Sequence, residues 1–334
     1  MTDLSKGRIL VTGGAGFIGS AVIWELNRRG VTNILVTDIL GQSEKWKNLV
    51  PLKFVDYLEA DDFLLSLKNS ANGFSDLSAI FHLGACSSTT ETDASYLIGN
   101  NYEYTKTLAE FAVSGKRRFV YASSAATYGS IAAGLPETVE LSDLRPLNMY
   151  GYSKHMFDLY ARQKGILPHI TGIKYFNVFG PNEYHKGDMR SVVHKAFHQI
   201  RETGAVQLFK SYRPEFRDGE QRRDFLYVKD AVAATVFLAE HVDGGGLFNL
   251  GSGEPNTWLT LVRAIYDALG KEPRIEFIEM PPVIRDKYQY FTCAHIDKLR
   301  AAGFKQPLAP LHDAVYDYVA RYLVPGRNLG DEPK

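Results

Sequence analysis

The sequence predicts an α/β protein with a doubly wound parallel sheet and a smaller mixed α/β domain. Short apolar runs alternate with helical patterns, and strands that are apolar throughout are typical of a parallel sheet covered by helices on both faces. The chain has 334 residues, which allows two domains or one large domain with an insertion. With 45% hydrophobic residues it can bury a sizeable core, so a disordered or fibrous chain is excluded.

Strand-like runs recur along the first half of the chain and are expected to form the parallel sheet. They occupy residues 8–12, 33–37, 52–55, 79–83, 118–123 and 170–176. Between the first two, residues 21–29 are expected to form a helix that ends at Gly30, with Arg28 and Arg29 in its last turn. Repetition of this βαβ unit gives a doubly wound fold, whose ligands lie beyond the carboxyl ends of the strands.

The pattern changes after about residue 176. Glycines and prolines from Gly180 to Gly246 interrupt shorter elements, as expected for a second region of irregular segments. Part of the chain returns to the first region, because residues 224–228 and 247–250 are strand-like and residues 230–240 are helical. We therefore expect one domain of residues 1–176 with the returning segment 224–252, and a second domain of residues 177–223 and 253–330.

Composition and charge exclude several classes of partner. The chain has 38 Lys and Arg against 38 Asp and Glu, without a long run of one sign, so neither nucleic acid nor a membrane surface is expected as a partner. No run approaches the roughly 20 apolar residues of a transmembrane helix, and the N-terminus lacks a signal-peptide core. Cys86 and Cys293 are too few for a disulfide framework and lack metal-ligand spacing. We expect a cytoplasmic protein without a bound metal.

A glycine-rich turn follows the first strand directly. Gly14, Gly16 and Gly19 have the G-x-G-x-x-G spacing, and Gly13, Gly16 and Gly19 have the three-residue spacing of the short-chain dehydrogenase group. Without side chains here, the backbone can approach a pyrophosphate, whose charge is stabilised by free amides at a helix N-terminus. The strand, turn and helix order predicts a Rossmann-like, dinucleotide-binding first domain.

The choice between the two nicotinamide dinucleotides stays open at this point. Asp38 ends the second strand, where its carboxylate can accept hydrogen bonds from the adenosine ribose and would repel a 2′-phosphate. Lys45 and Lys47 follow and can neutralise such a phosphate, or simply lie in a solvated loop.

Tyr150 and Lys154 form a Tyr-x-x-x-Lys motif and share one face of a helix. A neighbouring ammonium stabilises the phenolate of a tyrosine, which can then take the proton of a substrate hydroxyl as hydride leaves the carbon. Ser124, at the end of its strand, can hydrogen-bond the reacting oxygen. Placed downstream of a dinucleotide turn, these three residues predict a dehydrogenase-type active site.

Longer motifs make the resemblance to one family close. Residues 13–19, 82–91, 121–129, 150–154, 175–181 and 185–187 resemble those of the ADP-L-glycero-D-manno-heptose 6-epimerases, nucleotide-sugar epimerases of the extended short-chain dehydrogenase/reductase family. The similarity covers nearly the whole chain. The glycine and Tyr/Lys motifs are shared by all extended short-chain dehydrogenases, whereas residues 85–90 and 185–187 are much more particular to the heptose epimerases.

The resemblance implies a redox-neutral reaction that supplies heptose for the lipopolysaccharide core. Bound NADP would take hydride from C6″ of ADP-D-glycero-D-manno-heptose and return it to the other face of the transient ketone, with NAD as the alternative cofactor. Inversion needs acid/base groups on two sides of the carbon, and the family match assigns them to Tyr150 and Lys186. Independently of that match, Lys186 lies in a Gly-rich loop where burial can lower its pKa, although it can also be an exposed lysine.

The resemblance also implies the remaining site residues. Besides Lys154 and Lys186, the cofactor would contact Gly13, Gly16, Phe17, Ile18, Gly19, Asp38, Ile39, Lys45, Leu83, Gly84, Ala85, Cys86, Ser87, Asn100 and Val178. The nucleotide sugar would contact Asn177, Asp188, Lys195, Phe209, Lys210, Ser211, Tyr212, Arg223 and Tyr288.

Charge and sequence departures bear on the substrate. Arg213, Arg217, Arg222 and Arg223 cluster with Lys210, and arginine forks match the oxygens of a diphosphate, although the cluster can also be a solvated basic loop. Asp188 and Lys195 stand where the family often has a serine and a histidine at the substrate. Ala60 stands where a lysine approaches the cofactor, so a related nucleotide sugar remains an alternative substrate.

Two other functions compete with epimerisation. A net oxidoreductase or dehydratase would use the same Tyr150 and Lys154, but a dehydratase of this fold carries an Asp-Glu pair where this chain has Ala126 and Thr127. A dinucleotide-sensing regulator is the third possibility, and such proteins often lose the Tyr/Lys pair. The family resemblance further implies a homo-oligomer, and more specifically a homopentamer.

Overall fold

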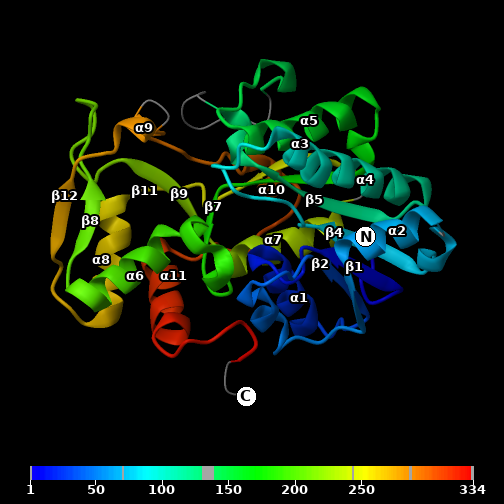
Figure 1. The fold of residues 1–334 in the computed structure, drawn as a ribbon, viewed down its shortest axis with the longest axis horizontal. Helices are drawn as coiled ribbons and strands as arrows, with labels where there is room; N and C mark the ends of the chain where they lie inside the picture. The colour runs from blue at the N-terminus through cyan, green and yellow to red at the C-terminus, as the bar shows by residue number, and fades with distance from the viewer. Residues whose placement is uncertain (1, 70, 130–138, 243, 286–287, 332–334) are drawn as a thin grey trace.

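A parallel sheet forms the centre of the larger part of the molecule (Figure 1). The structure is a computed structural model that describes residues 2–69, 71–129, 139–242, 244–285 and 288–331. In these ranges the sheet has seven strands in the order β10-β6-β5-β4-β1-β2-β3, which confirms the predicted doubly wound fold. The strands are β1 (Arg8–Thr12), β2 (Ile34–Asp38), β3 (Asp56–Glu59), β4 (Leu77–His82), β5 (Arg118–Ser124), β6 (Thr171–Tyr175) and β10 (Gly246–Leu250).

Helices cover both faces of this sheet because its strands are apolar on both sides. In β1, Ile9 and Val11 join the core beneath α1 and α7, whereas Leu10 joins the core beneath α2, α4 and α5. Figure 1 shows these two helical layers on opposite sides of the sheet. The helices are α1 (Phe17–Arg28), α2 (Ala60–Asn69), α3 (Ala94–Leu97), α4 (Tyr104–Ser114), α5 (Met149–Gln163) and α7 (Val228–His241).

Short helical turns connect these elements. They are η1 (Glu44–Leu49), η2 (Ala71–Phe74), η3 (Ile98–Glu103), η4 (Ala125–Tyr128), η5 (Leu141–Asp143) and η6 (Leu167–His169). The turn η3 has π-type geometry and runs directly into α4.

A smaller region with one mixed and one parallel sheet lies at one end of the large sheet (Figure 1). One small sheet contains β11 (Pro255–Thr257), β9 (Arg222–Tyr227) and β7 (Asn177–Phe179), and the other pairs β8 (Val206–Phe209) with β12 (Ile275–Ile278). The helical segments of this region are η7 (Tyr184–Met189), α6 (Val192–Thr203), α8 (Trp258–Leu269), α9 (Pro282–Arg285), α10 (Asp297–Ala301), α11 (Leu311–Tyr318) and η8 (Val319–Leu323).

The returning segment divides between the two regions. Helix α7 packs on α1, and β10 pairs with β6 at the edge of the large sheet. Strand β9 pairs with β7 and β11 in a small sheet instead. The chain therefore crosses back into the large region at the start of α7, at Val228.

Two expected elements differ from the structure. The strand predicted at residues 52–55 was wrong, because the third strand is β3, which pairs with β2 at the sheet edge. An edge strand needs no fully apolar run, and β3 is partly exposed. Helix α1 begins at Phe17 and not at the predicted residue 21. Gly19 was assigned to the glycine turn, whereas in the structure it lies in the first turn of this helix. No helix in the described ranges is both long enough and apolar enough to cross a membrane.

Candidate active site

The glycine turn between β1 and α1 forms a cradle that side chains would fill. Gly13 has φ +65°, and a Cβ added to it would lie 2.6 Å from the backbone nitrogen of Gly84. A Cβ on Gly19 would lie 2.0 Å from the carbonyl oxygen of Gly13. These glycines therefore leave the backbone uncovered by side chains just before and within the first turn of α1, which begins at Phe17. The free backbone amides of a helix N-terminus favour binding of an anion. These residues fit the pyrophosphate of a dinucleotide.

Asp38 ties the end of β2 to this turn. Its Oδ2 accepts hydrogen bonds from the backbone amides of Ala15 (2.9 Å) and Gly16 (3.1 Å). Its Oδ1 accepts from the amide of Ile39 and from Lys45 Nζ, which lies 2.6 Å away. Lys45 therefore neutralises the carboxylate, which removes much of the repulsion that Asp38 alone would exert on a phosphate.

A cavity of about 560 Å³ runs from this turn to the carboxyl ends of β4, β5 and β6. It collects most of the residues expected at the cofactor: Gly13, Gly16, Phe17, Ile18, Gly19, Asp38, Lys45, Leu83, Gly84, Ala85, Cys86, Ser87, Lys154, Val178 and Lys186. Ile39 and Asn100 lie outside its lining; Ile39 is exposed, and Asn100 donates a hydrogen bond to Asn101.

Asn101 is a structural residue of this site that sequence reasoning missed. Its Oδ1 accepts from the backbone amide of Cys86, and its Nδ2 donates to the carbonyl of Cys86 and to Ser153 Oγ. Ser153 Oγ in turn donates to the carbonyl of Tyr150. Asn101 thereby joins the cavity wall after β4 to helix α5. Only its place in a π-type turn, a geometry common near functional sites, could have drawn attention to it.

Ser124, Tyr150 and Lys154 meet in the cavity as the motif predicts. Ser124 ends β5, while Tyr150 and Lys154 lie one turn apart on α5. Burial raises the pKa of Tyr150, and its hydrogen bond with Ser124 opposes that rise. Burial also lowers the pKa of Lys154, which is 4% exposed, to about 8, while the charge of Asp158 acts in the opposite direction. The tyrosine therefore needs a nearby cation to ionise, and Lys154 is the cation on its own helix face.

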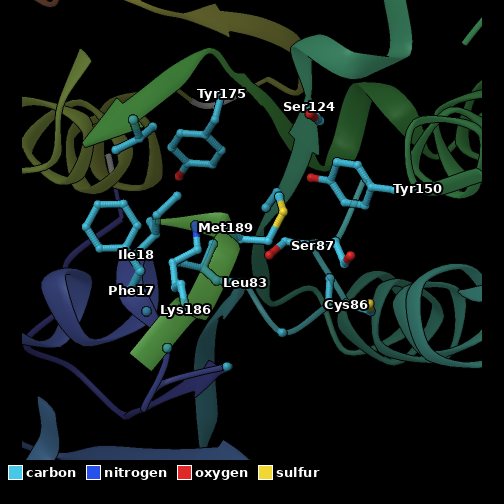
Figure 2. Close-up of a pocket in the computed structure, with 18 of the residues that line it drawn as sticks. Phe17, Ile18, Leu83, Cys86, Ser87, Ser124, Tyr150, Tyr175, Lys186 and Met189 are labelled. Carbon is cyan, nitrogen blue, oxygen red and sulfur yellow. The ribbon is translucent and has the colours of Figure 1, made fainter. Parts of the chain in front are cut away.

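Lys186 enters the same cavity from η7. Figure 2 shows Lys186 beside Phe17 and Ile18, across the cavity from Tyr150, with Met189 between them. Its Nζ lies 5.2 Å from the centre of the Phe17 ring. Burial lowers the pKa of Lys186, and the nearby carboxylate of Glu183 opposes that decrease. Lys186 is partly buried, and a lysine with a depressed pKa can exchange a proton more readily than a fully exposed one.

A second cavity of about 950 Å³ adjoins the first. The two share Ser124, Tyr150, Tyr175, Phe176 and Asn177, and the second extends past Thr90, Arg223 and Tyr288. Arg223 is 7% exposed, and its guanidinium lies 5.1 Å from the ring of Tyr288 and 5.8 Å from that of Trp258.

Arg223 carries a charge that its surroundings do not neutralise. Its side chain donates to the carbonyl of Arg222, and among the described residues it has no ion pair. Burial accordingly lowers its pKa, and the main opposing influence is Tyr288. A buried cation of this kind is costly unless an anion pairs with it.

Several residues expected at the nucleotide sugar lie outside both cavities. Asp188 and Lys195 are exposed and contact each other, since Lys195 Nζ donates to the carbonyl of Asp188. Lys210 pairs with Glu279 at 2.7 Å, and the hydroxyl of Tyr212 also donates to Glu279. Neither cavity is lined by Phe209, Ser211, Arg213, Arg217 or Arg222.

The arrangement can hold a dinucleotide in one cavity and an anionic substrate in the other. The shared wall carries Ser124 and Tyr150, so a substrate hydroxyl and a cofactor would meet there. Tyr175 and Phe176, at the end of β6, also line this wall, although the motif that contains them was not read as a contact with either ligand. Met189 of η7, which no motif indicated, lines the first cavity.

Comparisons with known proteins show which family this chain belongs to. The NAD dependent epimerase/dehydratase family matches residues 9–251. The ADP-L-glycero-D-manno-heptose-6-epimerase of Nitratidesulfovibrio vulgaris is 49% identical over 315 residues, which cover 94% of this chain and 97% of that protein.

Solved structures match over similar spans. The crystal structure of ADP-L-glycero-D-manno-heptose-6-epimerase from Helicobacter pylori has 27% identity and a TM-score of 0.81, covering 96% of this chain and 98% of that one. UDP-glucuronic acid 4-epimerase from Bacillus cereus, solved with NAD, has 25% identity and a TM-score of 0.73, covering 94% of this chain and 99% of that one.

Proposed function

Because this chain belongs to the NAD dependent epimerase/dehydratase family, and within it to the ADP-L-glycero-D-manno-heptose-6-epimerases, we propose that it inverts C6″ of ADP-D-glycero-D-manno-heptose. The product is ADP-L-glycero-D-manno-heptose, and the reaction causes no net oxidation. The observation that carries the proposal is the position of Tyr150 and Lys186 across one cavity, beside a second cavity that contains the buried cation Arg223.

The cofactor of this reaction is a nicotinamide dinucleotide, in keeping with the family and with the NAD-bound relative from Bacillus cereus. When bound, it supplies reversible hydride transfer at C6″. Gly13, Gly16 and Gly19 would hold its pyrophosphate, and Asp38 its adenosine ribose. We propose NADP as the preferred form, because Lys45 lies 2.6 Å from Asp38 and can neutralise added negative charge at this place.

Tyr150 acts on one side of the carbon. It takes the proton of the C6″ hydroxyl as the carbon is oxidised to a ketone, and it can give the proton back in the reverse sense. Lys154 stabilises the phenolate that Tyr150 needs, since a nearby ammonium favours the charged form of the tyrosine. Ser124 holds the reacting oxygen by a hydrogen bond.

Lys186 acts on the other side. After the ketone turns its opposite face to the cofactor, its oxygen must gain a proton from a group on the far side of the carbon. Lys186 is the cation across the cavity from Tyr150, and burial lowers its pKa, which eases proton release. A simple dehydrogenase needs only one such group, so the pair favours epimerisation.

Arg223 accounts for recognition of the sugar nucleotide. A guanidinium binds diphosphate oxygens through paired hydrogen bonds, and this pairing neutralises a cation that the protein buries. Tyr288 and Asn177 line the same cavity and would contact the ligand beside it. In this proposal the large region binds the dinucleotide and the smaller region binds the nucleotide sugar.

The proposal is tested by incubating the purified protein with ADP-D-glycero-D-manno-heptose. The C6″ configuration is followed by NMR while the absorbance of reduced nicotinamide is recorded. We expect a mixture of both epimers without accumulation of reduced cofactor, and no 4-epimerisation of UDP-glucose in a parallel sample. Reduced cofactor formed in step with product would indicate a net oxidoreductase, loss of water would indicate a dehydratase, and either result would contradict the proposal.

A further inference from the structure

A third cavity, of about 530 Å³, lies behind the segment that carries Lys186. It is lined by residues of η1, η7 and α6 and by the segment from Leu323 to Asn328 near the C-terminus. Cationic and imidazole side chains dominate its polar lining, which includes Lys47, His185, Arg190, His194, His198 and Arg201. We propose that this cavity binds a small phosphate-bearing anion, which controls the position of Lys186.

Two guanidinium groups give the cavity an excess of positive charge. The acidic residue of the lining, Glu44, already pairs with Lys47 at 2.7 Å. In the described part of the chain, neither Arg190 nor Arg201 forms an ion pair, and the Nε of Arg190 is buried without a hydrogen-bond partner. Guanidinium groups match phosphate oxygens in geometry as well as charge, so an anion of this type would satisfy them.

The imidazole groups support an anion in preference to a metal ion. His194 and His198 lie one turn apart on α6, with ring centres 4.6 Å apart. Within the described residues, no group of three His, Cys, Asp or Glu side chains has an arrangement that could hold a metal ion. Their surroundings are cationic instead: Arg190 and Lys195 face His194, and Arg190 and Arg201 face His198 together with Glu202. The same side chains can donate hydrogen bonds to phosphate oxygens.

The cavity is linked directly to the active site by η7. His185 lines both the third cavity and the cofactor cavity, and its neighbours Lys186 and Met189 line only the latter of these two. Asn48 Nδ2, at the same boundary, donates to the carbonyls of Ala15 in the glycine turn and of Asn182 before η7. Tyr184 ties the start of η7 to the C-terminal segment through the carbonyl of Arg327, at 2.6 Å. An anion on Arg190 would therefore favour one position of the segment that carries Lys186.

The third cavity differs from the proposed diphosphate site at Arg223, which lines the second cavity on other elements. This separation allows the two sites to be distinguished by mutation. Free phosphate and a phosphate ester share the chemistry that the cavity recognises, so the test includes inorganic phosphate, inorganic pyrophosphate and a hexose monophosphate as separate probes.

The test is isothermal titration of the cofactor-saturated enzyme with each probe. We expect at least one probe to bind the wild-type enzyme, and Arg190→Gln and Arg201→Gln each to weaken that binding about tenfold or more. Arg223→Gln and the exposed Arg263→Gln should leave it unchanged. Absence of binding by every probe, or loss of binding in Arg223→Gln but not in Arg201→Gln, would overturn the proposal.

Turnover tests the link to Lys186. The probe that binds should change the kcat of wild-type epimerisation and should have no such effect on Arg201→Gln, whose kcat without the probe should match that of the wild type. Arg201 is exposed on α6, so this variant should keep the wild-type melting temperature. Binding with an unchanged kcat would overturn control of Lys186 by the anion.

Discussion

Tyr150 and Lys186 line the same cavity but enter it from different parts of the fold, Tyr150 from α5 beside the large sheet and Lys186 from η7. Figure 2 shows the two side chains across the cavity from each other. Inversion at a carbon needs proton transfer on both of its faces, whereas oxidation alone needs it on one. The position of these two residues is therefore the feature of the structure most specific to an epimerase.

Replacing Lys186 should stop epimerisation without removing the cofactor. We expect Lys186→Met to lower kcat about 10²–10⁴-fold, which is the usual contribution of a positioned acid or base. The measurements are NMR of C6″ and fluorescence titration of the cofactor. Lys271→Met, at an exposed position after α8, is the matched control and should keep full activity. A Lys186→Met enzyme that turns over at the wild-type rate would exclude Lys186 as the second group.

Lys45 should set the preference for NADP over NAD. Because its ammonium lies 2.6 Å from Asp38, Lys45→Ala would leave the carboxylate unneutralised beside the 2′-phosphate. We expect the Kd for NADP to rise about tenfold, equivalent to 1.4 kcal/mol, and the Kd for NAD to change much less. Lys47→Ala serves as the control, since Lys47 pairs with Glu44 instead. If Lys45→Ala weakened the binding of NADP and NAD equally, Lys45 would not contribute to recognition of the 2′-phosphate.

The buried ion pair between Lys174 and Asp158 should contribute strongly to the free energy of unfolding. The two are 2% and 0% exposed and lie 2.8 Å apart, and Asp158 also accepts hydrogen bonds from Tyr121 and Ser123. Removing one partner of such a pair costs about 3–5 kcal/mol, because the other charge stays buried. We expect this loss in the free energy of unfolding of Lys174→Met, measured by urea denaturation.

The control for that experiment is the partly exposed pair of Lys106 and Glu103. Lys106→Met should cost less than about 1 kcal/mol, as is usual for ion pairs near the surface. The interpretation of Lys174 would be refuted by similar losses in the two variants.

Acid should destabilise the fold through His194. Burial, with help from His198 and Arg190, lowers the pKa of His194 from 6.5 to about 4. The unfolded chain then binds more protons than the folded protein between these values, so this contribution to stability is lost as the pH falls from 6.5 toward 4. We expect the urea midpoint of His194→Gln to fall less than that of the wild type between about pH 7 and about pH 5. An unchanged pH dependence in His194→Gln would refute the assignment.

Residues of the glycine and Tyr/Lys motifs lie around one cavity because their positions depend on short-range chain constraints. Gly13, Gly19 and Asp38 must stand at fixed distances from a strand end, and Tyr150 and Lys154 must lie one helical turn apart. Spacing in the sequence therefore determines their position in space, and the structure brings them together around one cavity.

Residues of the substrate region were harder to predict because their position depends on tertiary packing. Lys210, Arg213 and Arg223 lie close together in the sequence. Of these three, only Arg223 lines the second cavity, whereas Lys210 pairs with Glu279. Asn101 was missed for the same reason, since its partners Cys86 and Ser153 are distant in sequence. Charge clustering along a chain does not reveal which side chains a fold will bury.

Deuterium at C6″ tests the central claim most directly. ADP-D-glycero-D-manno-heptose labelled at C6″ is incubated with the enzyme in ordinary water, and the label and configuration of C6″ are read by NMR. If the carbon is oxidised and reduced again between Tyr150 and Lys186, the inverted product keeps its deuterium and reduced cofactor does not accumulate. Inverted product that has lost its deuterium to solvent would contradict oxidation at C6″ and with it this account of the active site.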